Sequence, residues 1–260
     1  MSIDQLFNVK NGTFSYGREI VFTNLSFHLR QGVFYGLIGP NGSGKSTLID
    51  LLMGTKILHS GSISFRSRVL QKYNRRELAR HLALVPQHFV IGFDFNVYDI
   101  VMMGRHPHIP RFSSPAAHDL AIVDAVLSLL DIQHLQDRPV AHLSGGEKQR
   151  VIVARALAQE TEVVMLDEAT SSLDIEHTLE IMRILRKKVK GSKITVIAAI
   201  HDLNLASAFC DEFLVLKDGS LRDAGPVTDV LTQELLHDVF SVNATVLHHK
   251  GYPAIEFDMR

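Results

Sequence analysis

One segment of the chain carries residues spaced to hold phosphate groups. Residues 39–46 fit the pattern G-x-x-x-x-G-K-[ST]. Its glycines let backbone N–H groups close around phosphate oxygens, and a helix that follows presents its positive end to the same charge. Lys45 is expected to reach the β- and γ-phosphates, and the Ser46 hydroxyl to coordinate Mg²⁺. The residues predicted to bind nucleotide here are Gly39, Pro40, Asn41, Gly42, Ser43, Gly44, Lys45, Ser46 and Thr47.

Two carboxylates follow an apolar run later in the chain. Residues 163–166 read Val-Val-Met-Leu and lead directly into Asp167 and Glu168. A buried strand would deliver both side chains at its carboxyl end, where α/β sheets bind ligands. Asp167 suits the Mg²⁺ shell, and Glu168 can orient or deprotonate an attacking water. Together with the phosphate-binding segment, this pair predicts nucleotide hydrolysis with Mg²⁺. The phosphate-binding segment alone leaves kinases, GTPases and motors open.

A third motif spans residues 143–150, Leu-Ser-Gly-Gly-Glu-Lys-Gln-Arg. Ser144 and Glu147 have the spacing of a capping box at a helix start. Gly145 and Gly146 exceed what capping needs, and they expose N–H groups at the helix N-terminus. The motif therefore predicts a second anion-binding surface, and a chain with two such surfaces can bury one nucleotide between two copies of itself.

The elements that must position these residues alternate between strands and helices. The first sixty residues are β-rich, and residues 11–12, Asn-Gly, indicate either a hairpin turn or a bulge in one continuing strand. The expected strands are residues 5–9, 13–16, 25–29, 33–38, 62–65, 163–166, 194–200 and 213–216. The expected helices are residues 45–53, 119–130, 147–158 and 175–189.

This order predicts an α/β fold with a mainly parallel sheet. A mostly helical stretch from about residue 96 to residue 159 interrupts the alternation of strands and helices. It predicts a helical block inserted into the α/β core.

The amino-acid composition limits the classes of protein to which the chain can belong. The chain has 260 residues, a net charge of -1 and 46% apolar residues, so it can bury a large core but gives no electrostatic basis for wrapping nucleic acid. Its one cysteine, Cys210, permits no internal disulfide and is interpreted as a packing residue. No secretory signal is expected at the N-terminus, and no apolar run approaches the roughly 18 residues of a membrane span. Any membrane role is therefore expected to be peripheral.

These motifs, in this order, resemble the nucleotide-binding subunit of ATP-binding cassette (ABC) transporters across essentially the whole chain. Residues 144–150 resemble that family's signature motif, and Tyr16 matches the aromatic residue that stacks on adenine. Gln87 matches the glutamine that senses Mg²⁺ and the transmembrane partner. Ser172-Leu173-Asp174 matches the loop that crosses the dimer interface, and His201 matches the switch histidine that contacts the γ-phosphate.

The resemblance implies a head-to-tail homodimer that sandwiches two ATP molecules. Lys45, Ser46, Gln87, Asp167, Glu168 and His201 of one copy would face Ser144, Gly145 and Gly146 of the other. It also implies a P-loop NTPase core, an N-terminal antiparallel β subdomain, a helical subdomain over about 88–160 and a tail over about 225–260. Ala169 stands where many importer subunits carry proline, which puts nothing catalytic in doubt.

A narrower resemblance points to import. Residues 101–108, Val-Met-Met-Gly-Arg-His-Pro-His, and the tail with residues 230–236 are similar to subunits that energise uptake of iron siderophores, haem or cobalamin. The implied partners are polytopic permease subunits and, indirectly, an extracytoplasmic substrate-binding protein. The implied location is the cytoplasmic face of the inner or plasma membrane.

Three alternatives stay open. The chain could serve an ABC exporter, or a non-transport ABC protein that acts in translation or DNA repair. The pairs His106 and His108, or His248 and His249, could be imagined as iron ligands. They lack a clustered set of ligands with metal-site spacing, so Mg²⁺ with ATP is the only metal predicted.

Overall fold

The N-terminal strands form an antiparallel sheet in the order β2-β1-β4-β5. The strands are β1 (Gln5–Tyr16), β2 (Glu19–Arg30), β4 (Ser60–Phe65) and β5 (Arg68–Val69). The pairing of β1 with β2 shifts register between Val9 and Gly12, and Asn11 has a φ of 48°. Residues 5–9 and 13–16, expected as separate strands, are therefore one strand with a bulge, and the hairpin interpretation of Asn11-Gly12 is wrong.

We describe the computed structural model of the chain over residues 5–87, 89, 94–169, 174–192, 194–249 and 251–257. It divides into two units, one made of Met1–Tyr73 with Val189–Arg260 and the other of Asn74–Lys188. We call these unit 1 and unit 2.

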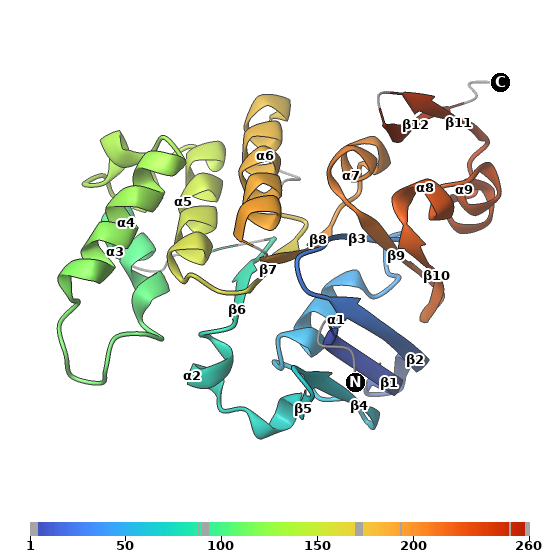
Figure 1. The fold of residues 1–260 in the computed structure, drawn as a ribbon, viewed down its shortest axis with the longest axis horizontal. Coiled ribbons are helices and arrows are strands. Elements are labelled where there is room, and N and C mark those ends of the chain that lie inside the picture. The colour runs from blue at the N-terminus through green and yellow to red at the C-terminus, as the bar shows by residue number, and fades with distance from the viewer. Residues whose placement is uncertain are drawn as a thin grey trace. The chain divides into compact units, whose positions relative to one another are not determined.

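Unit 1 also contains parallel strands, in the order β10-β9-β3-β8. These are β3 (Phe34–Ile38), β8 (Thr195–Ala199), β9 (Glu212–Lys217) and β10 (Ser220–Pro226), and only β10 is antiparallel to its neighbour. Every residue of β3 and β8 is buried, as expected for strands covered on both faces. The expected strands at 33–38, 194–200 and 213–216 are confirmed. Helix α1 (Lys45–Leu52) follows β3, and α7 (Leu203–Phe209) follows β8 (Figure 1).

The C-terminal part of unit 1 adds α8 (Val227–Val230), α9 (Gln233–Phe240) and a hairpin of β11 (Ala244–His249) with β12 (Tyr252–Phe257). Asp238 on α9 accepts hydrogen bonds from Lys217 Nζ at 2.9 Å and Arg222 Nε at 2.6 Å. These two cations belong to β9 and β10, so the ion pairs attach α9 to the edge of the sheet.

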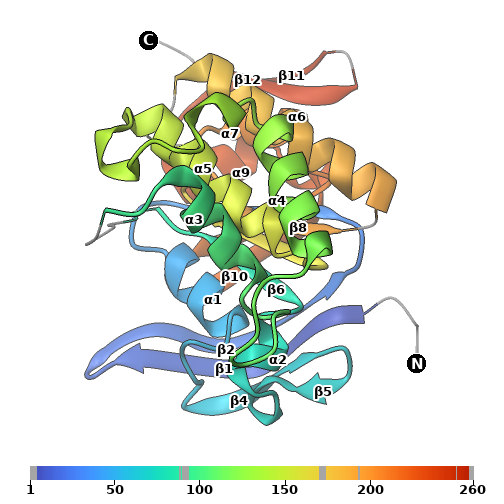
Figure 2. The same cartoon turned by 90° about the vertical axis from the view of Figure 1, so that its left-hand side faces the viewer.

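Unit 2 holds two parallel strands and most of the helices. The strands are β6 (Leu82–Val85) and β7 (Val163–Asp167). The helices are α2 (Arg75–Leu78), α3 (Val97–Met102), α4 (Ala117–Leu129), α5 (Gly145–Ala158) and α6 (Ile175–Ser192), of which α6 extends past the end of the unit. Helices α3, α4 and α5 pack against one another (Figure 2). The expected helices are confirmed as elements, whereas the boundaries of an inserted subdomain over 88–160 and of a tail over 225–260 stay predictions.

A buried arginine fastens the helices of unit 2 together. Arg105, with a side chain only 3% exposed, donates from Nε to Asp119 Oδ1 at 2.9 Å and from Nη1 to the Ala158 carbonyl at 2.7 Å. A second Nη1 contact, at 3.0 Å, reaches the carboxylate of Glu160. The pKa of Asp119 lies below its ordinary value, first because the Ala116 N–H bonds to it and then because of Arg105. Arg105 thereby links the end of α3 to α4 and to the end of α5.

The glycine before this arginine is fixed by contact with α5. A Cβ on Gly104 would lie 2.3 Å from the Arg155 carbonyl oxygen, so no larger residue fits. The segment that suggested a metal-chelate importer therefore has a structural role inside unit 2.

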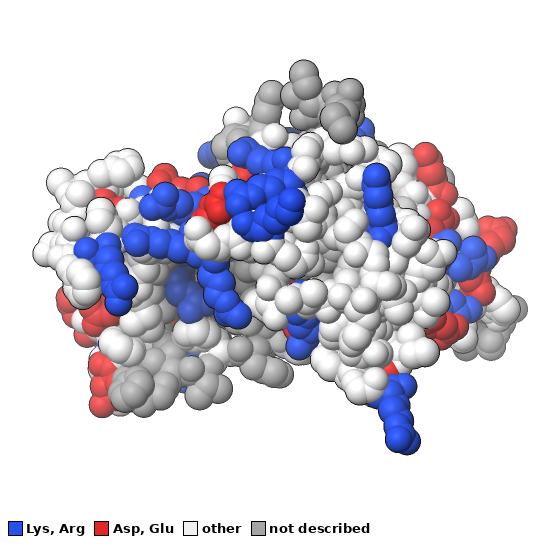
Figure 3. All heavy atoms as spheres, turned by 90° about the horizontal axis from the view of Figure 1, so that it is seen from below, with Lys and Arg blue, Asp and Glu red and all other residues white. Residues whose placement is uncertain are grey.

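None of the described helices is long and apolar enough to cross a membrane. On the face drawn in Figure 3, Lys and Arg side chains gather in places, and Asp and Glu side chains also appear. This mixture agrees with a net charge of -1.

We predict that Arg105→Ala lowers the free energy of unfolding by about 3 kcal/mol, because it leaves a buried carboxylate without its cation. Urea denaturation measures the loss. Arg111→Ala is the matched control, since Arg111 is exposed and lies over the Phe112 ring, and we expect a change within about 0.5 kcal/mol. Equal effects of the two substitutions would contradict the fastening role of Arg105.

Candidate functional site

The phosphate-binding loop lies between β3 and α1, in unit 1. Gly39, Gly42 and Gly44 have φ values of 152°, 79° and 97°, a region that L side chains rarely adopt. A Cβ on Gly39 would lie 2.2 Å from the Leu216 carbonyl oxygen, and one on Gly44 would lie 2.6 Å from Phe22 Cζ. Packing within this chain therefore requires glycine at 39 and 44, and the backbone angle alone favours it at 42.

Lys45 and Ser43 supply polar groups inside this loop. Lys45 is 4% exposed, and its Nζ donates to the carbonyls of Gly39 at 2.9 Å and Pro40 at 3.1 Å. Ser43 Oγ is buried and has no hydrogen-bond partner among the described residues. A buried hydroxyl without a partner is costly, and a bound phosphate oxygen would satisfy it. Together with the N-terminus of α1 and the exposed Ser46, these groups fit a nucleotide phosphate with Mg²⁺.

Tyr16 lies at the end of β1 and belongs to the same unit. Its hydroxyl is 3.4 Å from Thr47 Oγ1 on α1, and the Phe14 ring meets it edge-on at a centroid distance of 5.0 Å. The Tyr16 side chain remains partly exposed at 45%. The ring is thus held in place yet open enough to stack on a base.

Lys56 is a neighbour of Tyr16 that sequence reasoning missed. Its Nζ lies 4.9 Å from the ring centroid, a cation–π distance. No pattern in the sequence marks this lysine, because the contact joins the loop after α1 to the end of β1.

His201 follows β8 within unit 1. Because β3 and β8 are parallel, with Leu37 opposite Ala199, their carboxyl ends meet at one edge. The loop that begins at Gly39 and the exposed His201 therefore leave the sheet at the same edge. Asp202 caps α7 by accepting from the N–H groups of Asn204 at 2.9 Å and Leu205 at 3.0 Å.

Unit 2 brings Gln87 and Glu168 together. Gln87 Nε2 donates to Glu168 Oε2 at 2.7 Å, although the two residues are 81 positions apart. Strands β6 and β7 are parallel with Val85 opposite Leu166, so the residues that follow them emerge side by side. Asp167 ends β7, and Glu168 after it has a left-handed backbone with a φ of 49°. A carboxylate held by an amide at the end of a strand suits the positioning of water.

The signature motif begins α5 as the sequence predicts. Ser144 Oγ accepts from the Glu147 N–H at 3.3 Å, and Glu147 Oε2 accepts from the Ser144 N–H at 2.7 Å. The pKa of Glu147 lies below its ordinary value, first because the Ser144 hydroxyl donates to its carboxylate. A Cβ on Gly145 would meet nothing within 4 Å, in contrast to Gly39 and Gly44. Nothing in the described part of the chain therefore requires a glycine at 145.

Asp174 precedes α6 and holds its first turn. It accepts from the His177 N–H at 2.9 Å, and its other carboxylate oxygen lies 2.8 Å from His177 Nδ1, a partner that the sequence did not suggest. The backbone hydrogen bond of His177 is the first cause of the lowered pKa of Asp174. Ser172 and Leu173, expected to cross the dimer interface with Asp174, lie outside the described residues.

His108, one of the histidines that could be imagined as iron ligands, has a backbone carbonyl as its partner. The His108 ring lies 2.9 Å from the Gln159 carbonyl oxygen, which occupies Nε2. Among the described residues no group of three or more His, Cys, Asp or Glu could hold a metal ion. The side chains of His248 and His249 are not among those described.

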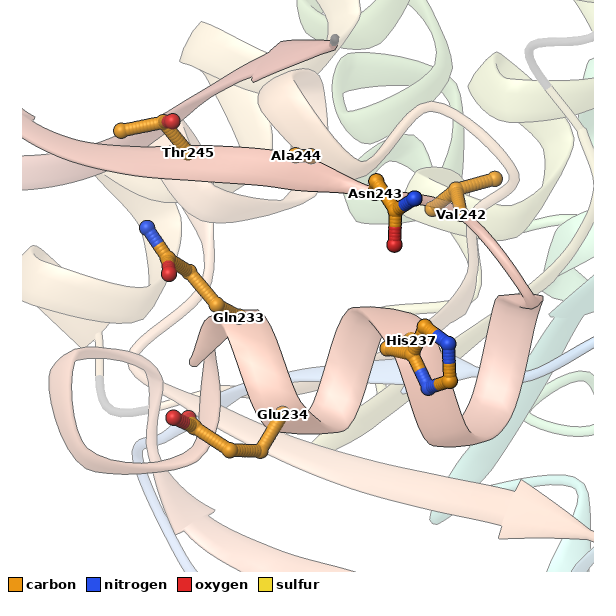
Figure 4. Close-up of a pocket in the computed structure, with 7 residues that line it drawn as sticks. All are labelled: Gln233, Glu234, His237, Val242, Asn243, Ala244 and Thr245. Atoms are coloured by element: carbon orange, nitrogen blue, oxygen red, sulfur yellow. The ribbon is translucent and has the colours of Figure 1, made fainter.

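An open pocket of about 520 Å³ lies elsewhere in unit 1. Gln233, Glu234 and His237 of α9 line it on one side, and Asn243, Ala244 and Thr245 on the other (Figure 4). None of the predicted site residues lines it.

The parallel sheet, the loop between β3 and α1 and the carboxylates after β7 define a P-loop nucleotide-binding protein. The model of the ABC transporter family matches residues 22–171, more than half of the chain, so the chain belongs to that family.

Two relatives that are similar to this chain are import ATP-binding proteins. The Hemin import ATP-binding protein HmuV of Thermobifida fusca (strain YX) is 38% identical over 244 residues, covering 93% of this chain and 84% of that protein. The Cobalamin import ATP-binding protein BtuD of Halobacterium salinarum (strain ATCC 29341 / DSM 671 / R1) is 38% identical over 218 residues, or 84% of this chain. This chain spans only 54% of that protein's length.

A solved structure supports the same fold. A metal-chelate type ABC transporter in an inward-facing conformation superposes with a TM-score of 0.84 at 31% identity. The match covers 98% of this chain and 97% of the chain in that structure. The predicted P-loop fold is thereby confirmed.

We predict opposite effects for two glycine substitutions. Gly39→Ala combines an unfavourable φ with a clash against Leu216, so we expect about 2 kcal/mol of lost stability. Gly145→Ala places a better helix former in open space at the start of α5, so stability should be unchanged or higher by up to about 1 kcal/mol. Thermal unfolding of both variants beside the parent chain measures the contrast, and a loss at Gly145 as large as at Gly39 would contradict it.

Proposed function

We propose that this chain hydrolyses ATP to energise an ABC importer for a metal chelate such as haem, cobalamin or an iron siderophore. The observation that carries the catalytic part is the Gln87–Glu168 hydrogen bond at the ends of two parallel strands. The import part is supported by two relatives, which are import ATP-binding proteins for cobalamin and hemin, and by the Gly104-Arg105 segment.

In this proposal the nucleotide is held by its base and its phosphates. Tyr16 stacks on adenine, and the backbone and side chains of residues 39–47 bind the phosphates. Ser46, Asp167 and Gln87 are the residues that would hold Mg²⁺, which when bound neutralises charge on the β- and γ-phosphate oxygens.

Hydrolysis then requires an oriented water. Glu168 orients the water for in-line attack on the γ-phosphorus and accepts its proton, while Gln87 fixes the carboxylate at 2.7 Å. Lys45 and His201 donate hydrogen bonds to γ-phosphate oxygens, where negative charge must be stabilised in the transition state. Positioning and electrostatics therefore supply most of the rate enhancement.

A second copy of the chain would complete each site. The N–H groups of Ser144, Gly145 and Gly146 at the start of α5 are suited to a γ-phosphate presented by the partner copy. The open space around Gly145 supports this, because a glycine with no internal reason leaves room for an external group. Asp174 would lie at the same homodimer interface.

The remaining partners are polytopic permease subunits and, through them, an extracytoplasmic substrate-binding protein. The chain would act at the cytoplasmic face of the inner or plasma membrane. ATP binding would close the homodimer, and hydrolysis would open it.

We predict that Glu168→Gln keeps ATP affinity within about two-fold but slows hydrolysis by about a hundred-fold or more, because a general base contributes about that much. The amide is the same size and can still accept a hydrogen bond from Gln87. Phosphate release measures the rate, and light scattering with ATP should detect accumulated dimer.

Glu162→Gln is the control, since Glu162 directly precedes β7 and its Oε1 lies 2.7 Å from His81 Nδ1 in unit 2. Wild-type hydrolysis by Glu168→Gln would remove Glu168 from the catalytic role.

We predict that the chain co-purifies as two copies with a permease dimer encoded by adjacent genes. In proteoliposomes that complex should move haem, cobalamin or a ferric siderophore toward the face that binds ATP, in proportion to ATP hydrolysed. Radiolabelled cargo measures direction and selectivity, and a complex with Glu168→Gln is the inactive control. Movement in the opposite direction would indicate an exporter, and co-purification with ribosomes or DNA would contradict transport.

A further inference from the structure

Helix α7 binds the C-terminal hairpin through side chains that hydrogen-bond to the backbone of β12, as a neighbouring strand would. Asn204 Nδ2 donates to the Ile255 carbonyl at 3.2 Å, and the Ile255 N–H donates to Asn204 Oδ1 at 2.6 Å. Two residues earlier on β12, the Pro253 carbonyl accepts from Ser207 Oγ. Figures 1 and 2 both draw α7 beside β12. The two side chains thus satisfy backbone groups of β12 that β11 does not pair.

Neither partner in this contact is expected to be stable alone. A helix of seven residues is too short to persist in water, and an isolated two-stranded hairpin is marginal. Ile255 on the hairpin and Ala206 and Ser207 on the helix are all buried, at 7%, 0% and 2% exposure. The hairpin and α7 therefore stabilise each other, and loss of the hydrogen bonds should release both.

The position of α7 matters because His201 lies two residues before its first turn. Asp202 bonds to the N–H groups of Asn204 and Leu205, so its place follows that of the helix. On the other side, the Ile200 N–H donates to the Leu37 carbonyl of β3 at 3.4 Å. His201 is therefore held between the sheet and α7, and only the α7 side depends on the hairpin.

We propose that Asn204 is a positioning residue for ATP hydrolysis, which fixes His201 by bonding α7 to the C-terminal hairpin. The hairpin is then part of the catalytic apparatus although it touches no nucleotide. This inference rests on the proposed role of His201 at the γ-phosphate.

The test begins with Asn204→Ala in the full chain. We expect kcat to fall about ten-fold while the Kd for ATP stays within about two-fold, because a small displacement of a catalytic group costs rate without removing the phosphate-binding loop. Ser207→Ala removes the second bond to β12 independently and should also lower kcat. Asn204→Asp keeps an acceptor for the Ile255 N–H but replaces the donor with a carboxylate oxygen that faces the Ile255 carbonyl, so its kcat should also fall.

Asn243→Ala is the matched control. Asn243 is an exposed asparagine just before β11, and it lines the pocket beside α9. Its kcat should equal that of the parent chain. If Asn204→Ala does not fold, Ser207→Ala and Asn204→Asp provide the same measurement, with thermal unfolding recorded for each variant.

The decisive measurement combines Asn204→Ala with His201→Ala in single-turnover assays, in which slow hydrolysis can be timed. If Asn204 acts through His201, the double variant hydrolyses ATP at the rate of His201→Ala alone. A further ten-fold loss in the double variant, or a parent-like kcat for Asn204→Ala, would overturn the inference while leaving the proposed function standing. A parent-like rate for His201→Ala alone would instead refute the role of His201, and the inference with it.

Discussion

Parallel pairing of neighbouring strands is the constraint on which the candidate site depends. The carboxyl ends of parallel strands lie at one edge of the sheet. Residues that follow these strands are therefore close in space although they are distant in sequence, and no local sequence pattern marks them. In unit 1 this pairing of β3 with β8 sets the start of the phosphate-binding loop beside the segment that holds His201. In unit 2 the pairing of β6 with β7 does the same for Gln87 and Glu168. The strands are mostly apolar, and apart from Asp167 at the end of β7 the polar residues of the candidate site lie in the segments that follow these strands.

Glycines in the two motifs predicted to bind phosphate have different physical roles. Gly39 and Gly44 adopt backbone angles that exclude other residues, and their missing side chains make room for Leu216 and Phe22 of the same chain. Gly145 is helical, and a Cβ at this position would meet only open space. No contact among the described residues therefore depends on the absence of a side chain here. Glycine lowers the helix propensity of this position, and no contact within the chain compensates for it. Such a pattern is expected where a surface binds a group from another molecule. The comparison of the two motifs is thus an argument for a second copy of the chain.

Much of this arrangement could be predicted from sequence because the motifs are local. The phosphate-binding loop, the carboxylates after residues 163–166 and the capping box at Ser144 each depend on residues within a few positions of one another. The bulge at Asn11-Gly12 was left undecided, because the same dipeptide suits a hairpin, and only pairing along the whole of β1 distinguishes the two. The short α7 and the hairpin of β11 and β12 could not be predicted, since each is stabilised by the other rather than by its own sequence.

The Gln87–Glu168 hydrogen bond is a contact that the pattern of residue types in the sequence does not predict. Family resemblance assigns the two residues separate roles, but the 2.7 Å bond between them makes the orientation of the carboxylate depend on the loop after β6. Glu168 also has a left-handed backbone, a conformation that costs about 1–3 kcal/mol and persists only where surrounding contacts hold it. Because the amide of Gln87 is one such contact, a movement of its loop would change both the direction of the carboxylate and the stability of the turn. The same hydrogen bond can therefore align the base for hydrolysis and make that alignment sensitive to whatever binds the loop that carries Gln87.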